Sequence, residues 1–97
     1  MAKAAYRPVA VRDLDWIFVH TKKRWDETQA VSYLSGLEDT CGLLAGQPRL
    51  GRACGYLRAG LRRMEHESHV IFYFEVKGGI RISRVLHKGM MPKWGMF

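Results

Sequence analysis

The apolar residues of this chain change their spacing once along the sequence, from a helical period to a strand period. Up to Leu44 they recur every three or four positions, as on one face of an α-helix. From Leu61 onward they alternate with polar residues, as on one face of a β-strand. Because the helices come first and the strands follow, the two should pack as separate layers, which is typical of an α+β fold.

Two helices are expected in the first half of the chain. Val11–Trp25 carries apolar residues on one helical face, and Pro8 marks the end or edge of a short strand before it. A second helix should follow Asp26–Gln29, whose sequence Asp-Glu-Thr-Gln resembles a capping box, and a glycine and a proline within 45–48 should end it. Since the break between the helices is so short, they should form an antiparallel hairpin.

Three strands are expected after the helices, at Leu61–Glu65, His69–Val76 and Ile80–His87. A Lys-Gly-Gly turn joins the last two, and the glycine- and arginine-rich residues 49–60 should form an ordered loop. The predicted fold class is therefore α+β in the order β-α-α-β-β-β. The N-terminal strand and the helical hairpin should pack on a small antiparallel sheet, in a single domain of residues 1–97.

Alternation along the strand His69–Val76 predicts which of its side chains are buried. Phe72 and Phe74 lie on its apolar face and should form core against the helices. Tyr73 points the other way, so it is predicted to lie at the surface.

The net charge of +7 is confined to the second half of the chain. Residues 1–48 hold six Lys or Arg and six Asp or Glu, whereas residues 49–97 hold ten Lys or Arg and three Glu. A one-sided basic surface attracts polyanions such as nucleic acid, an acidic protein or a membrane surface. A surface that only keeps the protein in solution is the alternative.

Several other classes of protein are not indicated. No stretch approaches the roughly 20 apolar residues that span a bilayer, and the N-terminus lacks an export signal, so a cytoplasmic location without a membrane partner is expected. Cys41 and Cys54 lack the spacing of a metal site or a disulfide framework, so they should be reduced thiols. His66 and His69 are spaced like metal ligands, but further ligands are missing, so neither a metal nor a cofactor is expected.

Four short motifs follow one another through the second half of the chain. They are Pro48–Arg52 (PRLGR), Gly60–Arg63 (GLRR), Glu67–Tyr73 (ESHVIFY) and Arg84–His87 (RVLH). Through them the chain from Tyr6 to about Pro92 resembles the ParE branch of the RelE/ParE toxin superfamily. The resemblance implies the β-α-α-β-β-β fold and the toxin half of a type II toxin–antitoxin pair.

The same resemblance implies the partners. ParE toxins act on DNA gyrase and so block replication, and a ParD-type antitoxin that wraps the toxin holds it inactive. The complex of the two represses its own operon, so operator DNA is expected to be contacted only through the antitoxin.

An mRNA interferase of the RelE or YoeB type is the chief alternative, since those ribonucleases share the fold. His87 could then act as the acid and Arg63 could hold the phosphate. The loop Arg49–Arg52 has no carboxylate to act as the base, so no catalytic residue is expected and the protein should not be an enzyme. A degenerate, non-toxic corepressor that works with its antitoxin is the third hypothesis.

Two binding surfaces are predicted. The antitoxin should contact an aromatic stretch of the first helix and the arginines of the loop that follows the second helix. These residues are Leu14, Trp16, Phe18, Arg49, Arg52 and Arg58. Tryptophan and arginine are the residues that most often anchor protein interfaces.

The target should contact a basic and apolar surface where the last strand ends. Its predicted residues are Arg62, Arg63, Arg84, His87, Lys88, Met90 and Trp94. For His87 the alternative is a purely structural histidine. For the tail the alternative is that it folds back over the sheet edge and buries Trp94.

Overall fold

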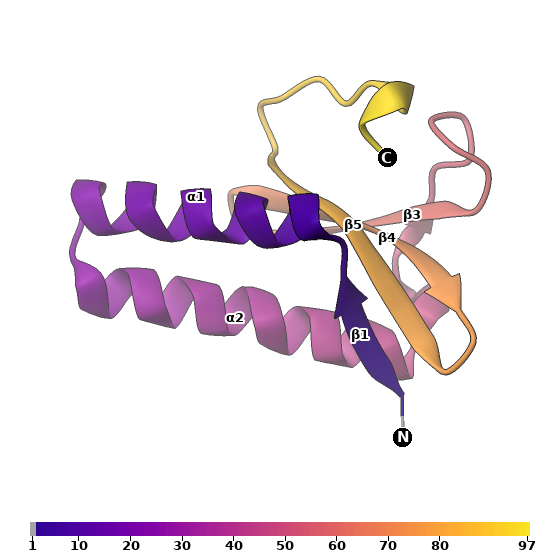
Figure 1. The fold of residues 1–97 in the computed structure, drawn as a ribbon, viewed down its shortest axis with the longest axis horizontal. Coiled ribbons are helices and arrows are strands. Elements are labelled where there is room, and N and C mark those ends of the chain that lie inside the picture. The colour runs from indigo at the N-terminus through magenta and orange to yellow at the C-terminus, as the bar shows by residue number, and fades with distance from the viewer. Residues whose placement is uncertain (1) are drawn as a thin grey trace.

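The computed structural model describes residues 2–97 and has two layers, a helical hairpin and a twisted sheet (Figure 1). The α+β class and the predicted order of elements are confirmed. A single-turn 3₁₀ helix, η1, precedes strands β2 to β5, and a second one, η2, follows them. The elements are β1 (Lys3–Tyr6), α1 (Pro8–Arg24), α2 (Glu27–Gly46), η1 (Pro48–Leu50), β2 (Arg52–Ala53), β3 (Leu61–His66), β4 (His69–Val76), β5 (Gly79–His87) and η2 (Trp94–Met96).

The sheet differs from the predicted antiparallel sheet in two ways. It has five strands in the order β1-β5-β4-β3-β2, and β1 joins it parallel to β5. The second difference is β2, a two-residue strand inside the segment predicted as a loop. Gly79 permits the close approach of β1, because its φ is 153° and a Cβ there would overlap the main chain of Lys3.

Helix α1 begins at Pro8, earlier than the predicted Val11, so assigning Pro8 to a strand end was wrong. A proline suits the first helical turn because its missing N–H would have no partner there. The buried residues of α1 are Ala10 and Ile17, whereas Val11 and Trp25 are exposed. Within residues 2–97, neither helix combines the length and the hydropathy that a membrane-spanning helix needs.

Helix α2 follows its prediction closely. The Asp26 side chain accepts a hydrogen bond from the Gln29 N–H at 2.7 Å, which caps the helix start. Leu37, Cys41 and Leu44, which recur at helical spacing, are buried. The helix ends at Gly46, and Pro48 opens η1.

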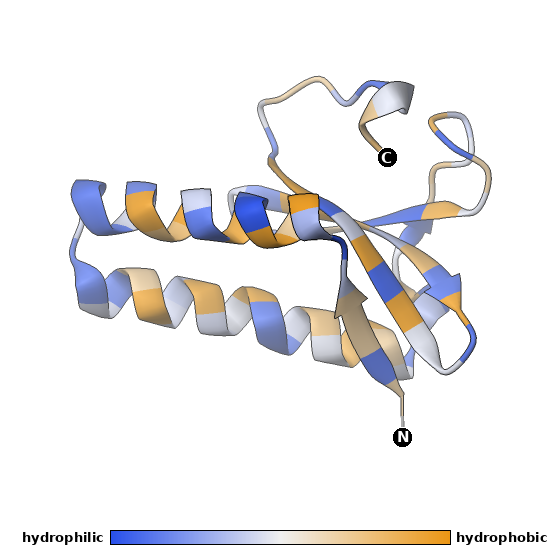
Figure 2. Ribbon diagram, in the orientation of Figure 1, coloured by the Kyte–Doolittle hydropathy of each residue, from blue (hydrophilic) through white to orange (hydrophobic). Residues whose placement is uncertain are grey.

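The sheet is covered on both faces, so it has two apolar clusters. The larger lies between the helices and the sheet and includes Leu37, Ile71 and Tyr73. The smaller lies on the opposite face, around Phe72, where the loop after β2 and the C-terminal segment cover it. Hydrophobic and hydrophilic residues alternate along the first half of β5 (Figure 2), whereas Val85 and Leu86 near its end are neighbours that pack on opposite faces of the sheet.

The predicted facing of β4 was wrong. Tyr73, predicted at the surface, is fully buried on the helix side. Its hydroxyl donates to the Pro48 carbonyl at 2.6 Å and accepts from the Gly51 N–H at 2.9 Å. Phe72 is buried on the face away from the helices, and the partly buried Phe74 packs beside it. Alternation could not give the facing, because residues of both parities are buried when a sheet is covered on both sides.

Candidate functional site

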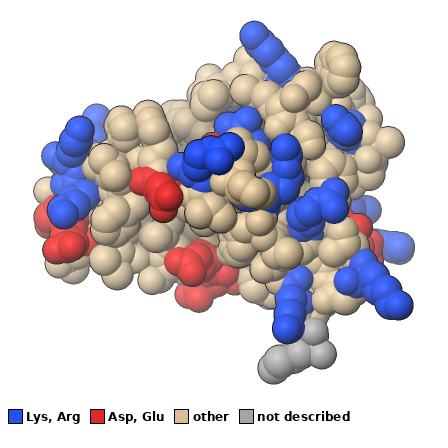
Figure 3. Space-filling model, in the orientation of Figure 1, with Lys and Arg blue, Asp and Glu red and all other residues tan. Residues whose placement is uncertain are grey.

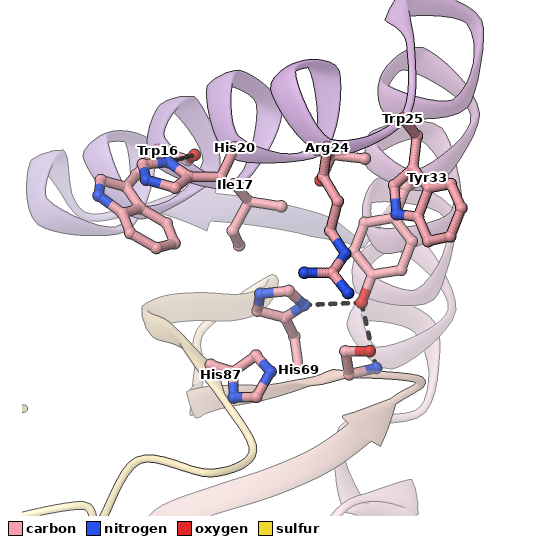
Figure 4. A pocket seen from close by; sticks show the side chains of 10 residues that line it. Trp16, Ile17, His20, Arg24, Trp25, Tyr33, His69 and His87 are labelled. Carbon is pink, nitrogen blue, oxygen red and sulfur yellow. Dashed lines mark hydrogen bonds between the residues drawn. The ribbon is translucent and has the colours of Figure 1, made fainter.

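A groove runs along α1, between this helix and the ends of β4 and β5 (Figure 4). It comprises two adjoining hollows of about 510 Å³ and 340 Å³, which share Trp16, Ile17, His69 and His87. We call it the α1 groove. It is lined by polar and aromatic side chains. These are Trp16, His20 and Arg24 of α1, Trp25 just after α1, Tyr33 of α2, and His69 and His87 of the sheet.

His69 forms the floor of the α1 groove and is held as a neutral ring. Its Nδ1 lies 2.7 Å from the Tyr33 hydroxyl, the contact drawn between them in Figure 4. Burial, together with the neighbouring imidazoles of His87 and His66, lowers the pKa of His69 from 6.5 to about 4. The ring therefore contributes shape and a hydrogen bond to the groove, but no positive charge near neutral pH.

His87 ends β5, as predicted, and opens onto the α1 groove. Its Nδ1 accepts a hydrogen bond from the Gly89 N–H at 3.0 Å, and its ring meets His69 edge-on with 5.5 Å between centroids. Because Nδ1 accepts, Nε2 carries the proton of the neutral ring. His87 can thus offer one hydrogen-bond donor to a bound partner, and its role in binding remains a prediction.

The two residues of the ribonuclease alternative do not converge. Arg63 lies on the face of the sheet away from the helices, with its guanidinium 5.3 Å from the ring centroid of Phe72. His87 faces the α1 groove on the helix side. An acid and a phosphate-binding cation on opposite faces of a sheet cannot act on one phosphodiester.

His66 and His69 do not form a metal site. His66 Nδ1 lies 3.0 Å from the Thr40 hydroxyl, and its ring packs closely against Gly36 of α2. Among residues 2–97 no cluster of three His, Cys, Asp or Glu side chains could hold a metal ion. Cys41 and Cys54 are free thiols, one in the apolar cluster under the helices and the other in the cluster on the opposite face of the sheet.

Known proteins match nearly the whole of this fold. The family model described as "ParE toxin of type II toxin-antitoxin system, parDE" matches residues 5–92. The chain belongs to the ParE toxin family. This confirms the resemblance carried by the four sequence motifs.

Individual relatives agree with the family match. Toxin ParE1 of Caulobacter vibrioides is 41% identical over 81 residues, covering 84% of this chain and 83% of that protein. Toxin ParE1 of Mycobacterium tuberculosis is 39% identical over 84 residues, covering 86% of each. The fold also matches a chain of the solved "Chromosomal ParDE TA system from P. aeruginosa", with a TM-score of 0.76, 19% identity, and coverage of 90% of this chain and 96% of that one.

The target surface predicted for this ParE toxin is divided by the fold. Arg63 lies on the Phe72 face, whereas Arg62 takes the opposite parity on β3 and donates to the Gly51 carbonyl at 2.7 Å. These two arginines were expected to act together, but the sheet separates them. The exposed residues of the predicted set at the strand exit are His87, Lys88, Met90 and Trp94.

Arg84 belongs to an internal ion pair. Its Nε and Nη2 donate to the two carboxylate oxygens of Asp13 on α1, at 2.8 and 3.0 Å, and the Val85 N–H donates to the same carboxylate. Asp13 raises the pKa of Arg84 by these hydrogen bonds. Both side chains are largely buried, so the pair fastens α1 to β5 and Arg84 offers little to a partner.

The antitoxin residues predicted for this toxin are also divided. Trp16 is 59% exposed, stacks on His20 with 3.5 Å between ring centroids, and lines the α1 groove. Leu14 and Phe18 are half-buried and lie on the other side of α1.

The loop arginines lie elsewhere. Arg49, Arg52 and Arg58 are exposed and lie just before, in and after β2, the edge strand opposite β1. Arg52 pairs with Glu65, and Arg49 lies 3.8 Å from Glu75. The structure thus joins Trp16 to His87 and Met90 in one groove, and not to these arginines.

Several groove residues were missed from the sequence, namely His20, Arg24, Trp25, Tyr33 and His69. The signal that could have found them is the pair of tryptophans in the first helical segment, because a globular chain seldom exposes two such side chains without a use. On the face shown in Figure 3, most Lys and Arg side chains lie over the sheet side, a further group lies at the far end of the helical hairpin, and Asp and Glu lie mainly over the helices.

Proposed function

We propose that this ParE toxin inhibits DNA gyrase by binding it, without chemistry of its own, and that a ParD-type antitoxin neutralises it in the cytoplasm. The observation that carries the proposal is the family match, which spans residues 5–92 and is backed by relatives about 40% identical. The separation of Arg63 from His87 supports an action that depends on binding.

The α1 groove is our candidate for the antitoxin contact. It combines exposed aromatic rings with arginine and imidazole donors, so a suitable occupant is an amphipathic segment with acidic residues on its polar side. Antitoxin segments of this kind fold on binding, which lets a short chain cover a long surface. Operator DNA would be contacted through the antitoxin.

Induced expression without the antitoxin gene tests the proposed function. Gyrase inhibition predicts arrested growth, filamentous cells and a DNA-damage response, all reversed by co-expression of the antitoxin. Rapid cleavage of translated mRNA without DNA damage would instead support an interferase. Normal growth at confirmed protein levels would support a non-toxic corepressor.

A further inference from the structure

The segment after β5, residues 88–97, folds back over the face of the sheet that the helices leave open (Figure 1). We call it the arch. At its start, the Lys88 N–H donates to the Ser68 carbonyl at 2.9 Å. At its end, the Phe97 ring is buried against Phe72, with 4.8 Å between the ring centroids. The arch is therefore fixed at both ends.

Polar contacts also fix the far end of the arch. Arg7 Nη1 donates to the main-chain oxygen of Phe97 at 3.0 Å and to the Ser83 hydroxyl at 2.9 Å. The Ser83 hydroxyl in turn donates to the same Phe97 oxygen at 3.4 Å. Ser83 is fully buried, so this triangle lies beneath the end of the arch and not in open solvent.

Ser83 reaches this place because β5 is irregular. Phe72 pairs with Arg84 and Tyr73 pairs with Ile82, so Ser83 is an extra residue in the ladder. Such a bulge re-aims the side chains around it. Here the bulge turns a small hydroxyl toward the arch, while Ile82 and Val85 both remain in the helix-side cluster.

The Arg7 side chain is not explained by its role in the helix that follows it. It occupies the residue before α1, where its side chain does not cap the helix and where the helix dipole disfavours a positive charge. Its main-chain N–H is bound to the Ile82 carbonyl at 3.0 Å, which holds it beside the bulge. The contacts that its guanidinium does make are to Ser83 and Phe97, far along the chain.

The middle of the arch is exposed although its ends are fixed. Met91 is 79% exposed and Trp94 is 71% exposed, and Lys88 and Lys93 of the same segment are exposed as well. A loop held at both ends loses less conformational entropy when it binds than a free tail does. Tryptophan and methionine also suit protein interfaces, as an anchor and as an adaptable contact.

We propose that Arg7 and Ser83 are positioning residues, which pin the arch through Phe97 and so hold Met91 and Trp94 outward for a partner protein. The partner surface that fits is an apolar pocket beside acidic groups, which complement Lys88 and Lys93. The proposal rests on the proposed function, because the partner it names is gyrase.

The experiment compares Arg7→Gln with Arg12→Gln, which removes the same charge from an exposed position on α1. Trypsin cleavage after Lys88 and Lys93 of the folded toxin measures how often the arch detaches. Inhibition of gyrase supercoiling measures the partner contact, and antitoxin affinity with the melting temperature reports on the rest of the fold. Arg7→Lys, which keeps the charge, and Trp94→Ala, which leaves the anchor intact, complete the set.

Arg7→Gln should be cleaved about tenfold faster than wild type, since a charged hydrogen bond is lost. It should inhibit gyrase about tenfold less, with a melting temperature near wild type. Antitoxin affinity should also stay near wild type, because Met90, the arch residue that lines the α1 groove, is held at the other end of the arch by its own main-chain hydrogen bond to the His87 carbonyl. Arg7→Lys should recover part of both, Arg12→Gln should match wild type, and Trp94→Ala should lose inhibition at the wild-type cleavage rate.

Two outcomes would overturn the inference. Wild-type cleavage of Arg7→Gln would show that Arg7 does not hold the arch. Faster cleavage with undiminished inhibition would show that the arch does not face the target. If Arg7→Gln does not fold, Phe97→Ala serves the same comparison. If wild-type toxin fails to inhibit gyrase, the proposed function is wrong. The cleavage rates alone then still test whether Arg7 holds the arch in place.

Discussion

Replacing Tyr73 by phenylalanine deletes one oxygen atom from the centre of this toxin. That oxygen joins β4 to the segment after α2, because it donates to the Pro48 carbonyl and accepts from the Gly51 N–H. Burial raises the pKa of Tyr73, so the hydroxyl remains protonated and able to donate. Gly51 is itself buried and lies so close to the Tyr73 hydroxyl that a side chain there would collide with it. The hydroxyl is therefore tightly packed, with no room beside it for a water that could take over its hydrogen bonds.

The expected loss of stability follows from these two contacts. A buried polar group left without a partner costs about 1–3 kcal/mol. Tyr73→Phe leaves the buried Gly51 N–H in that state and also removes the hydrogen bond to the half-buried Pro48 carbonyl, so the free energy of unfolding should fall by about 3 kcal/mol. In a domain of this size that corresponds to a melting temperature lower by roughly 15 °C.

Urea unfolding followed by circular dichroism measures the effect. Tyr56→Phe is the matched control, because Tyr56 is 78% exposed and its variant should stay within about 0.5 kcal/mol of wild type. A loss below 1 kcal/mol for Tyr73→Phe, at an unchanged denaturant slope, would refute the bridging role of the hydroxyl.

Three further variants test other parts of the account. Asp13→Ala should lower the free energy of unfolding by about 3 kcal/mol, since it strands the guanidinium of Arg84. The double variant Asp13→Ala/Arg84→Leu should recover more than about 1 kcal/mol of that loss. If the two single-variant losses in urea unfolding simply add, Asp13 and Arg84 do not stabilise the fold as an ion pair. His69 has its pKa lowered from 6.5 to about 4, so its contribution is complete above pH 6.5 and lost as the pH falls toward 4. Between these pH values the free energy of unfolding should rise with pH by up to ~1.4 kcal/mol per pH unit. His69→Phe should reduce this pH dependence, and an unchanged pH profile of unfolding would count against a neutral buried ring. Trp16→Ala should weaken antitoxin binding by about 2 kcal/mol in calorimetry with little change in melting temperature; unchanged affinity would remove Trp16 from that contact.

Local signals in the sequence predicted most of the fold. The cap at Asp26, the helix end at Gly46 and the Lys-Gly-Gly turn each depend on a few neighbouring residues, so spacing and residue type sufficed. The strand β1 was placed, but its parallel pairing with β5 was not. That pairing joins strands that are far apart in the sequence, and nothing local to either strand specifies it.

The site was predicted less well, because its geometry depends on contacts between distant segments. Arg62 and Arg63 are neighbours in sequence but lie on opposite faces of a sheet that is buried on both sides. Arg84 looked like a surface cation until Asp13, on another element, was found beside it. The tail does fold back, but over a face of the sheet and not over its edge as the alternative predicted, and it buries Phe97 and leaves Trp94 exposed.

Supercoiling of relaxed plasmid by purified gyrase, with and without this toxin, is the most direct test of the proposed function. We expect the toxin to inhibit supercoiling or to trap cleaved DNA, and an equimolar amount of its antitoxin to restore normal activity. Full supercoiling activity in the presence of excess folded toxin, together with cleavage of ribosome-bound mRNA by the same preparation, would contradict the account.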